Sequence, residues 1–391
     1  MSESDNDYWL QQRLADTEDY DPPDGSNAAE AEPGPTEAVN KLKAMGLVSV
    51  GARGWLEPGN NAPPRSKLLT TQDKNGREQL FMSRGKLAMM AAPGGTGKTQ
   101  LLFQLAVAVA SGVQWLQTYD VTQAGPVLLV LGEEDEDEMH RRIRGATDAM
   151  QSWAHAAQIS TNLHVLSMNG KTAGMTDKNG SETEFCRTLG AGLANWGVLW
   201  SLIILDPASR FLGPEAEIDN AAATRWIEAA ERLTQMPSKP SILFAHHANK
   251  GALAGSTDQG AARGSSALTD GVRLQMNLDR VTYQEKDAAG ISTGPRLVDP
   301  TRVILRVVKS NYGPIPEPLL LLRDFDHGGF LAPDPFPPPP EPKASGPGRQ
   351  KDCEHGAARK SPKNGTRKRS KQTNLGEVTV DDYEGDNSDC D

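Results

Sequence analysis

The octapeptide APGGTGKT at 92–99 constrains the fold of this chain more than any other segment. It matches the phosphate-binding loop G-x-x-x-x-G-K-[ST], except that Ala92 stands at the first glycine position. Glycines let backbone N–H groups turn toward phosphates, and a helix that follows points its N-terminus at the same charge. A methyl group at Ala92 is compatible with such a loop if its φ is negative. We therefore expect a strand, a phosphate loop and a helix in this order.

The segments around the loop have alternating strand and helix patterns. LAMMAA at 87–92 is apolar, and residues 97–110 place apolar side chains at helical spacing. Apolar runs at 126–132, 163–168, 202–206 and 241–247 predict strands, and helical patterns follow at 136–149, 182–195 and 220–233. Residues 302–310 and 318–325 predict a C-terminal β-hairpin. The predicted fold class is α/β, with a mainly parallel sheet flanked by helices.

Charge and composition divide the chain into three parts. The 391 residues have a formal net charge of −10, and residues 1–40 alone hold 11 acidic residues and one basic residue. We expect a disordered acidic tail over 1–40, one folded domain over 41–332, and a disordered tail over 333–391 that is Pro-rich, then basic, then acidic. Because the excess negative charge belongs to the N-terminal tail, it does not argue against a polyanionic ligand of the domain.

Several classes of protein do not fit the sequence. No run approaches the roughly 18 apolar residues that a membrane span needs, so no membrane partner is expected. The acidic start MSESDNDYW lacks the basic and apolar regions of a signal peptide. The three cysteines fit neither a disulfide framework nor a CxxC zinc pattern. We expect a cytoplasmic protein.

The loop predicts a nucleotide and its metal as cofactors, namely ATP and Mg²⁺. Lys98 is placed to reach the β- and γ-phosphates, and the Thr99 hydroxyl is placed to bind Mg²⁺. Asp206 ends the apolar strand LIILD, where ligands of parallel sheets collect, so it is a second candidate for the metal. The alternative for Asp206 is an ordinary helix N-cap before Pro207. The expected nucleotide-binding residues are Pro93, Gly94, Gly95, Thr96, Gly97, Lys98, Thr99 and Gln100.

Two further strand ends carry candidate catalytic groups. The segment GEED at 132–135 offers a carboxylate that can polarise the attacking water; we favour Glu134, with Glu133 as the alternative. The neighbouring acidic residues fit a solvated face or the start of a helix. His246 and His247 end the strand SILFAHH, where one imidazole can contact the γ-phosphate. A structural pair is the alternative, and a shared zinc site is disfavoured because adjacent strand residues point to opposite faces.

Two cations near loops are candidates for a residue that reaches another subunit's nucleotide. Arg263 follows a Gly/Ala/Ser-rich segment at 250–262, and the alternative is a plain surface cation. Lys309 ends the apolar run RVILRVV and is a second candidate.

These segments, in this order, resemble the RepA-type hexameric replicative DNA helicases of plasmids and phages, a branch of the RecA-like P-loop ATPases. The resemblance covers roughly residues 60–325. It rests on GGTGKT, GEED, LIILDPASRF, FAHHANK and ARGSSALTDGVR, with VVKSNYGP as weaker support. In two places the sequence departs from the family pattern: Ala92 replaces the first glycine, and Asn311 and Tyr312 stand where related ring helicases often carry a second cation.

The resemblance implies a RecA-like core assembled as a homo-hexameric ring, with ATP sites at the subunit interfaces. It implies that Glu134 is the catalytic base and that Asp206 supports the metal. His247 is implied to be the γ-phosphate sensor, and Arg263 the finger that acts across the interface. In such rings, loops at about 208–219 and 248–262 line the channel; they offer the cations Arg210 and Lys250 and one aromatic residue, Phe211.

Three functions are compatible with these features. The first is a ring helicase that uses ATP to move along single-stranded DNA. The second is a RecA-like ATPase that remodels protein–DNA complexes without unwinding. The third, a scaffold with a degenerate nucleotide site, is disfavoured because all the loop and carboxylate groups are present. The basic stretch at 359–371 predicts phosphate contacts with DNA, with solubility or docking of replication proteins as the alternative.

Overall fold

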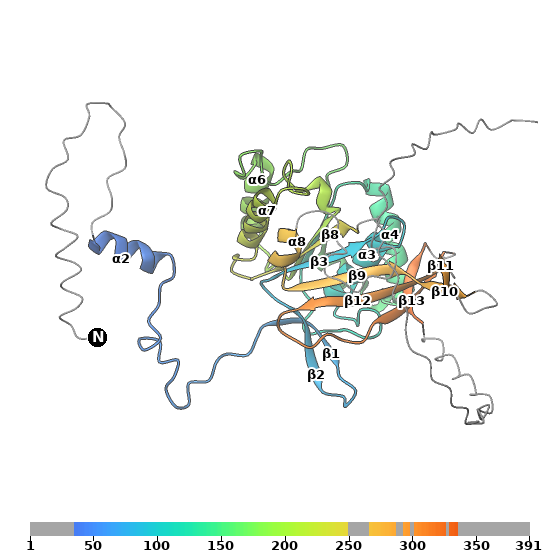
Figure 1. The fold of residues 1–391 in the computed structure, drawn as a ribbon, viewed down its shortest axis with the longest axis horizontal. Coiled ribbons are helices and arrows are strands. Elements are labelled where there is room, and N and C mark those ends of the chain that lie inside the picture. The colour runs from blue at the N-terminus through green and yellow to red at the C-terminus, as the bar shows by residue number, and fades with distance from the viewer. Residues whose placement is uncertain (1–34, 249–265, 287–291, 298–300, 326–327, 335–391) are drawn as a thin grey trace, which may run out of the picture. The chain divides into compact units, whose positions relative to one another are not determined.

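The computed structural model describes residues 35–248, 266–286, 292–297, 301–325 and 328–334 (Figure 1). Arg263, Lys250 and the two predicted tails apart from 35–40 and 333–334 lie outside these residues. Within them, no helix combines the length and apolarity needed to cross a bilayer.

A nine-stranded sheet forms the centre of the domain, in the order β14-β13-β12-β9-β3-β8-β7-β5-β6. All neighbours from β9 through β3, β8, β7 and β5 to β6 pair in parallel, whereas β12, β13 and β14 are added antiparallel. The bounds are β3 Leu87–Ala92, β5 Val127–Leu131, β6 Leu163–Ser167, β7 Leu202–Asp206, β8 Ser241–His247, β9 Leu274–Arg280, β12 Arg302–Ser310, β13 Leu319–Asp324 and β14 Phe330–Pro333. The predicted α/β class with a mainly parallel sheet is confirmed.

Helices cover both faces of this sheet, and alternate strand residues supply the two cores. In β3, Met90 and Ala92 pack with α3, while Leu87 and Met89 pack with α6 and α7 on the other face (Figure 1). The helix bounds are α3 Lys98–Ser111, α4 Glu136–Ala149, α5 Ala156–Asn162, α6 Glu184–Asn195, α7 Asn220–Leu233 and α8 Ser266–Gly271, with short 3₁₀ turns at Trp153–His155 and Ala208–Arg210. Burial on both faces explains why β3, β5 and β7 are continuous apolar runs.

Helix α3 is buried around nearly its whole circumference. Its partners are the sheet, α4, α5 and β14. Gln104 fixes the contact with β14, because its amide donates to the Leu331 carbonyl at 2.9 Å and accepts from the Leu331 N–H at 3.1 Å. The helix that follows the phosphate loop therefore contacts both the parallel strands and the antiparallel strand β14 of the same sheet.

A smaller sheet has the strand order β2-β1-β4. Its strands are β1 Lys67–Gln72, β2 Glu78–Ser83 and β4 Asp120–Val121. Strands β1 and β2 come before β3 in the sequence, and β4 comes after α3. Phe81 stacks on Tyr119 with ring centroids 4.0 Å apart, and Trp115 lies 5.4 Å from Tyr119. These buried rings join the small sheet to the end of α3.

Predicted and observed elements agree most closely where the sequence pattern is local. Helices α4 and α7 have the predicted bounds, and β12 and β13 form the predicted hairpin. The sequence patterns did not indicate β1, β2, β4, β9, β14, α5, α8, or the pair β10 Thr282–Lys286 and β11 Ser292–Leu297. Helix α2 spans Pro35–Ala44 and β14 ends at Pro333, so both predicted domain boundaries, 40/41 and 332/333, fall inside regular elements.

Candidate nucleotide-binding site

The carboxyl ends of four parallel strands bring the predicted site residues to one edge of the sheet. Ala92, at the end of β3, pairs with His247 at the end of β8, and Asp206 at the end of β7 pairs with Leu131 of β5. The segment at 132–135 directly follows β5. Residues from four distant parts of the sequence are therefore neighbours because parallel strands end together.

The phosphate loop has the backbone that its glycines allow. Gly95 and Gly97 have φ values of +73° and +94°, which residues with a Cβ rarely adopt. Ala92 is the last residue of β3 and is not among the residues with positive φ, so the replacement of the first glycine is tolerated as predicted. Thr96 is buried, and its hydroxyl donates to the Pro93 carbonyl at 2.9 Å, which closes the loop.

A cavity of about 270 Å³ lies over this loop. Its lining includes all the expected nucleotide-binding residues except Thr96, whose side chain is turned into the loop. The lining residues are Pro93, Gly94, Gly95, Gly97, Lys98, Thr99, Gln100, Glu133, Arg142, Pro207, His247 and Arg323. Sequence analysis did not predict Arg142 or Arg323.

The loop lysine and threonine both contact Asp206. The Lys98 ammonium forms a buried ion pair with Asp206 Oδ1, and Thr99 Oγ1 donates to Asp206 Oδ2 at 2.7 Å. Asp206 is not a helix N-cap, because the 3₁₀ turn that follows is capped by Pro207 without a side-chain hydrogen bond. A hydroxyl and a carboxylate side by side are the oxygen donors that Mg²⁺ prefers, so these residues fit the ion.

Glu133 and Glu134 occupy different environments. Glu133 is exposed and lines the cavity, whereas the Glu134 side chain is only 11% exposed. Burial, and next the charge of Asp206, raise the pKa of Glu134 above its usual range. Its Oε2 atom is buried and has no hydrogen-bond partner among the described residues. These properties are those of a carboxylate that can accept a proton from a water molecule.

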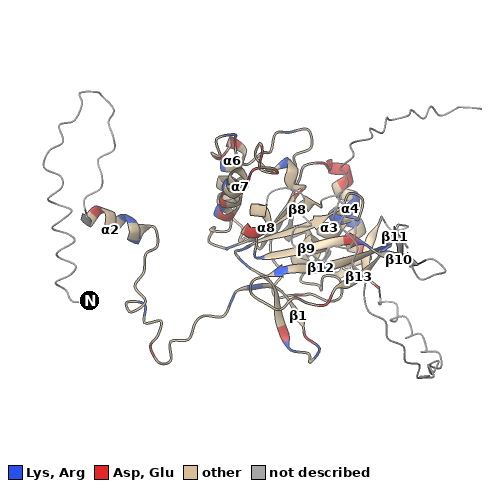
Figure 2. Cartoon of the chain, viewed as in Figure 1, with Lys and Arg blue, Asp and Glu red and all other residues tan. Residues whose placement is uncertain are grey.

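Arg142 of α4 links Glu134 to the loop. Its guanidinium lies 3.8 Å from Glu134, pairs with Glu138 at 2.8 Å and donates to Gln100 Oε1 at 3.3 Å. The acidic residues that begin α4 stabilise its N-terminus, with Asp135 as the cap (Figure 2).

The two histidines at the end of β8 face different surroundings. His247 is half-buried and lines the cavity, whereas His246 is 1% exposed. This difference agrees with the opposite orientation of adjacent strand residues. Among the described residues, no group of three His, Cys, Asp or Glu side chains could hold a metal ion.

Arginines from two strands that the motifs did not indicate also reach the loop. Arg280, at the end of β9, donates to the Gly94 carbonyl at 2.9 Å, and Arg323 of β13 donates to the Gly95 carbonyl at 2.7 Å. Strand β13 runs in the direction of β3, because the two antiparallel pairings β9–β12 and β12–β13 reverse the chain twice. Its carboxyl end therefore lies at the same edge as the phosphate loop.

Other predicted positions lie away from this cavity. Lys309 donates to the Thr269 and Asp270 carbonyls at the end of α8, at 2.9 and 3.0 Å. Phe211, the one aromatic residue that the sequence offers in the 208–219 loop, is fully buried in the core and is not available to stack on a base. Arg210 is exposed. Arg263 lies outside the described residues.

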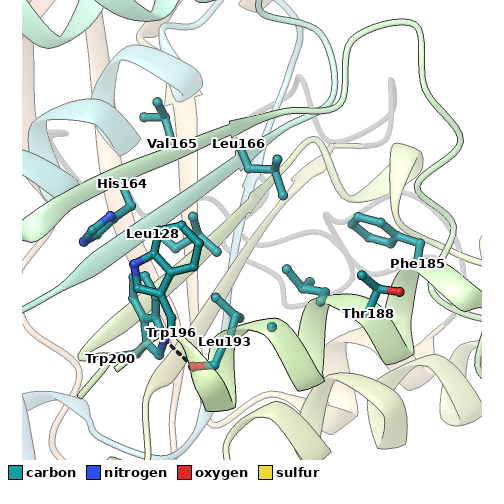
Figure 3. Close-up of a pocket in the computed structure, with 11 residues that line it drawn as sticks. Leu128, His164, Val165, Leu166, Phe185, Thr188, Leu193, Trp196 and Trp200 are labelled. Carbon is teal, nitrogen blue, oxygen red and sulfur yellow. Dashed lines mark hydrogen bonds between the residues drawn. The ribbon is translucent and has the colours of Figure 1, made fainter. Parts of the chain in front are cut away.

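A second cavity, of about 320 Å³, lies between β6 and α6 and contains none of the predicted groups (Figure 3). Trp196, Trp200, Leu193 and Phe185 contribute apolar surface, and the Trp200 indole donates to the Leu193 carbonyl at 3.0 Å. The one imidazole in the lining, His164, contacts both tryptophan rings edge-on, and burial lowers its pKa. An apolar lining of this kind cannot bind a polyphosphate, so the smaller cavity is the candidate site.

Two comparisons with known proteins found similarities over this part of the chain. Residues 65–252 match the family model of an AAA domain. The solved structure of a DnaB-like replicative helicase, described with its interactions with primase, is similar over 76% of this chain and 70% of its own, with 14% identity and a TM-score of 0.46. The match of the family model includes the phosphate loop, Glu134, Asp206 and His247. Residues 65–252 are therefore similar to an AAA domain.

Proposed function

We propose that the protein is an ATP hydrolase that forms a ring and acts as a DNA helicase in plasmid or phage replication. The observation that carries the hydrolase part is the contact of Lys98 and Thr99 with Asp206, beside the largely buried carboxylate of Glu134. A cation, a hydroxyl and two carboxylates are the groups that phosphoryl transfer to water requires. They lie at one sheet edge, over a glycine loop that opens a helix.

Each group has a distinct role in this mechanism. Lys98 and the N–H groups of the loop bind the phosphates, and Thr99 and Asp206 would hold Mg²⁺, which supplies charge neutralisation at the phosphates when bound. Glu134 orients the attacking water and accepts its proton; the raised pKa suits that task. His247, at the end of β8, lines the cavity and detects the γ-phosphate.

The helicase part rests on the resemblance of the ordered segments to RepA-type ring helicases. Single-stranded DNA needs cations along its path. Arg210 is the exposed cation that the described part of the 208–219 loop offers, and Phe211 is excluded by burial. The remaining contacts would come from 248–262 and from the basic stretch at 359–371. Arg263 would complete the ATP site of the neighbouring subunit.

A RecA-like ATPase that remodels protein–DNA complexes without unwinding is the second candidate. It is favoured by the scarcity of exposed cations and aromatic rings in the described 208–219 loop. Both candidates predict ATP turnover, but only a helicase predicts the opening of a tailed duplex.

One set of assays separates these functions. The full-length protein is assayed for ATP turnover with and without single-stranded DNA, and for strand displacement on a forked duplex, while mass photometry records ring size. Lys98→Ala is the inactive control. Displacement that requires ATP and Lys98 supports the helicase; turnover without displacement on either polarity supports remodelling. No turnover by the wild type would contradict both.

A mixing experiment tests the role of Arg263. Arg263→Ala and Lys98→Ala subunits, each nearly inactive alone, are combined after subunit exchange has been verified. If Arg263 acts on the neighbour, some interfaces in mixed rings join an intact Lys98 to an intact Arg263, and part of the activity returns. If no activity returns, wild-type subunits are titrated in: a proportional loss would indicate a role within the same subunit, and a steep loss concerted firing.

A further inference from the structure

Arg323 reaches the phosphate loop from the strands that lie on the other side of β3 from the predicted site residues. In the strand order, β8, β7 and β5 lie on one side of β3 and carry His247, Asp206 and the segment with Glu134. Strands β9, β12 and β13 lie on the other side, and β13 brings Arg323 into the lining of the cavity. The two groups therefore approach the loop from opposite directions.

The position of Arg323 is fixed by its surroundings. Its Nη1 donates to the Gly95 carbonyl at 2.7 Å, and its guanidinium lies 4.5 Å above the centre of the Phe325 ring. The N–H of Arg323 donates to the Thr301 carbonyl at 2.7 Å. The neighbouring strand β14 is tied to α3 through Gln104 and Leu331. The guanidinium is thus held against the same helix that the loop opens.

The charge of Arg323 is not neutralised within the described part of the chain. Neither Arg323 nor Arg280 has a carboxylate within ion-pair distance there, and both donate to uncharged carbonyls of the loop. Arg323 Nε is buried without a hydrogen-bond partner among the described residues. Burial, and then the charge of Arg280, lower the pKa of Arg323. A cation with a spare donor at the wall of a phosphate-sized cavity is arranged for an anion.

The place of Arg323 along the loop indicates which part of the nucleotide it serves. Its Nε lies 3.3 Å from where a Cβ on Gly97 would stand, beside the first residues of α3. The backbone N–H groups of such a loop cradle the α- and β-phosphates, whereas the lysine reaches the β- and γ-phosphates. The groups suited to the γ-phosphate are on the β8 and β7 side. Arg323 therefore lies beside the loop backbone, on the other side of β3 from the groups suited to the γ-phosphate.

We infer that Arg323 is a nucleotide-binding residue of its own subunit, which donates to the α/β-phosphate end of a nucleoside di- or triphosphate. Arg280 braces the loop beside it through the Gly94 carbonyl. This inference rests on the proposed nucleotide site and adds a cation from the antiparallel strands to it. Because ADP and ATP share the α- and β-phosphates, both ligands should depend on Arg323 equally.

The test is a titration of the full-length protein with fluorescent ATP and ADP analogues in the presence of Mg²⁺. Loss of one charge-assisted hydrogen bond in Arg323→Ala should weaken both nucleotides about tenfold. Arg323→Gln retains a donor for the Gly95 carbonyl but no charge. It should therefore weaken the binding of ATP and ADP about as much as Arg323→Ala does, while preserving the loop. Arg232→Ala removes an arginine of α7 that pairs with Glu182 and should bind like the wild type.

Each outcome has a distinct meaning. Wild-type affinity in folded Arg323→Gln would overturn the inference, and so would a loss confined to ATP, which would place Arg323 at the γ-phosphate. If Arg323→Ala fails to fold, Arg323→Gln decides. Lys98→Ala is titrated in parallel. If Lys98→Ala also binds the nucleotides like the wild type, the proposed nucleotide site itself fails. If Lys98→Ala binds them more weakly while Arg323→Gln binds them like the wild type, only the role of Arg323 is refuted.

Discussion

The cavity over the phosphate loop and the cavity between β6 and α6 are similar in volume, about 270 and 320 Å³, but opposite in chemistry. The one over the phosphate loop is lined by charged side chains and by backbone that only glycine readily adopts. The one between β6 and α6 is lined by tryptophan, leucine and phenylalanine side chains (Figure 3). Charges held in fixed places perform chemistry at some cost in stability, whereas buried apolar surface contributes stability and little chemistry. Volume alone does not identify a site.

This contrast predicts the largest effect for Lys98→Ala. Loss of the ammonium removes a cation from the phosphates, so ATP turnover should fall about 10³-fold or more, in an assay of released phosphate. The structure adds that Lys98 is ion-paired with the buried Asp206, so removal leaves a carboxylate without its cation and should lower the free energy of unfolding by about 3 kcal/mol.

The double variant Lys98→Ala/Asp206→Asn separates the two effects. It should recover part of the stability, measured by chemical denaturation, and none of the turnover. If Lys98→Ala had turnover close to that of the wild type, the cavity over the phosphate loop could no longer be distinguished from the apolar cavity as the catalytic site.

Glu134→Gln should have the next largest effect. The amide keeps the shape of the side chain but cannot accept a proton, so turnover should fall about 10²–10⁴-fold while nucleotide affinity is retained. Glu133→Gln is the matched control, because Glu133 lines the same cavity but is exposed. An inactive Glu133→Gln beside an active Glu134→Gln would move the base to Glu133.

The pH dependence of turnover should show the same carboxylate. Burial raises the pKa of Glu134, and the base must be ionised, so turnover should fall with acidification at a higher pH than an ordinary carboxylate would dictate. The charge of Arg142 lowers this pKa, so Arg142→Ala should move the acid limb to still higher pH. Arg141→Ala, which removes an exposed partner of the same Glu138, should leave the limb in place. An acid limb that survives in Glu134→Gln would refute the assignment.

How much of this site could be predicted depended on whether the signal was local. Lys98, Thr99 and Asp206 belong to short motifs at strand ends, and the structure brings them together as expected. Phe211 was only a candidate for contact with DNA, and its place in a loop segment does not reveal that the ring packs into the core. Arg323 lies 228 positions from Gly95, and its place depends on three strand pairings and two reversals of direction, which periodicity does not encode.

The smallest effect on turnover is expected from the apolar cavity. Leu193 of α6 is 7% exposed and lines this cavity, so Leu193→Ala should lower the free energy of unfolding by about 2–3 kcal/mol through lost burial and an enlarged cavity. The backbone carbonyl that accepts from Trp200 is retained. Turnover per folded molecule should stay within about twofold of wild type, because lost apolar burial moves none of the charges at the phosphate loop. Leu199→Ala, at a position 70% exposed, is the control for stability and should change it by less than about 0.5 kcal/mol. A large loss of turnover in stably folded Leu193→Ala would mean that a change in the apolar cavity alters the phosphate loop. The connection would be β5, because Leu128 of this strand lines the cavity and the candidate base follows its carboxyl end.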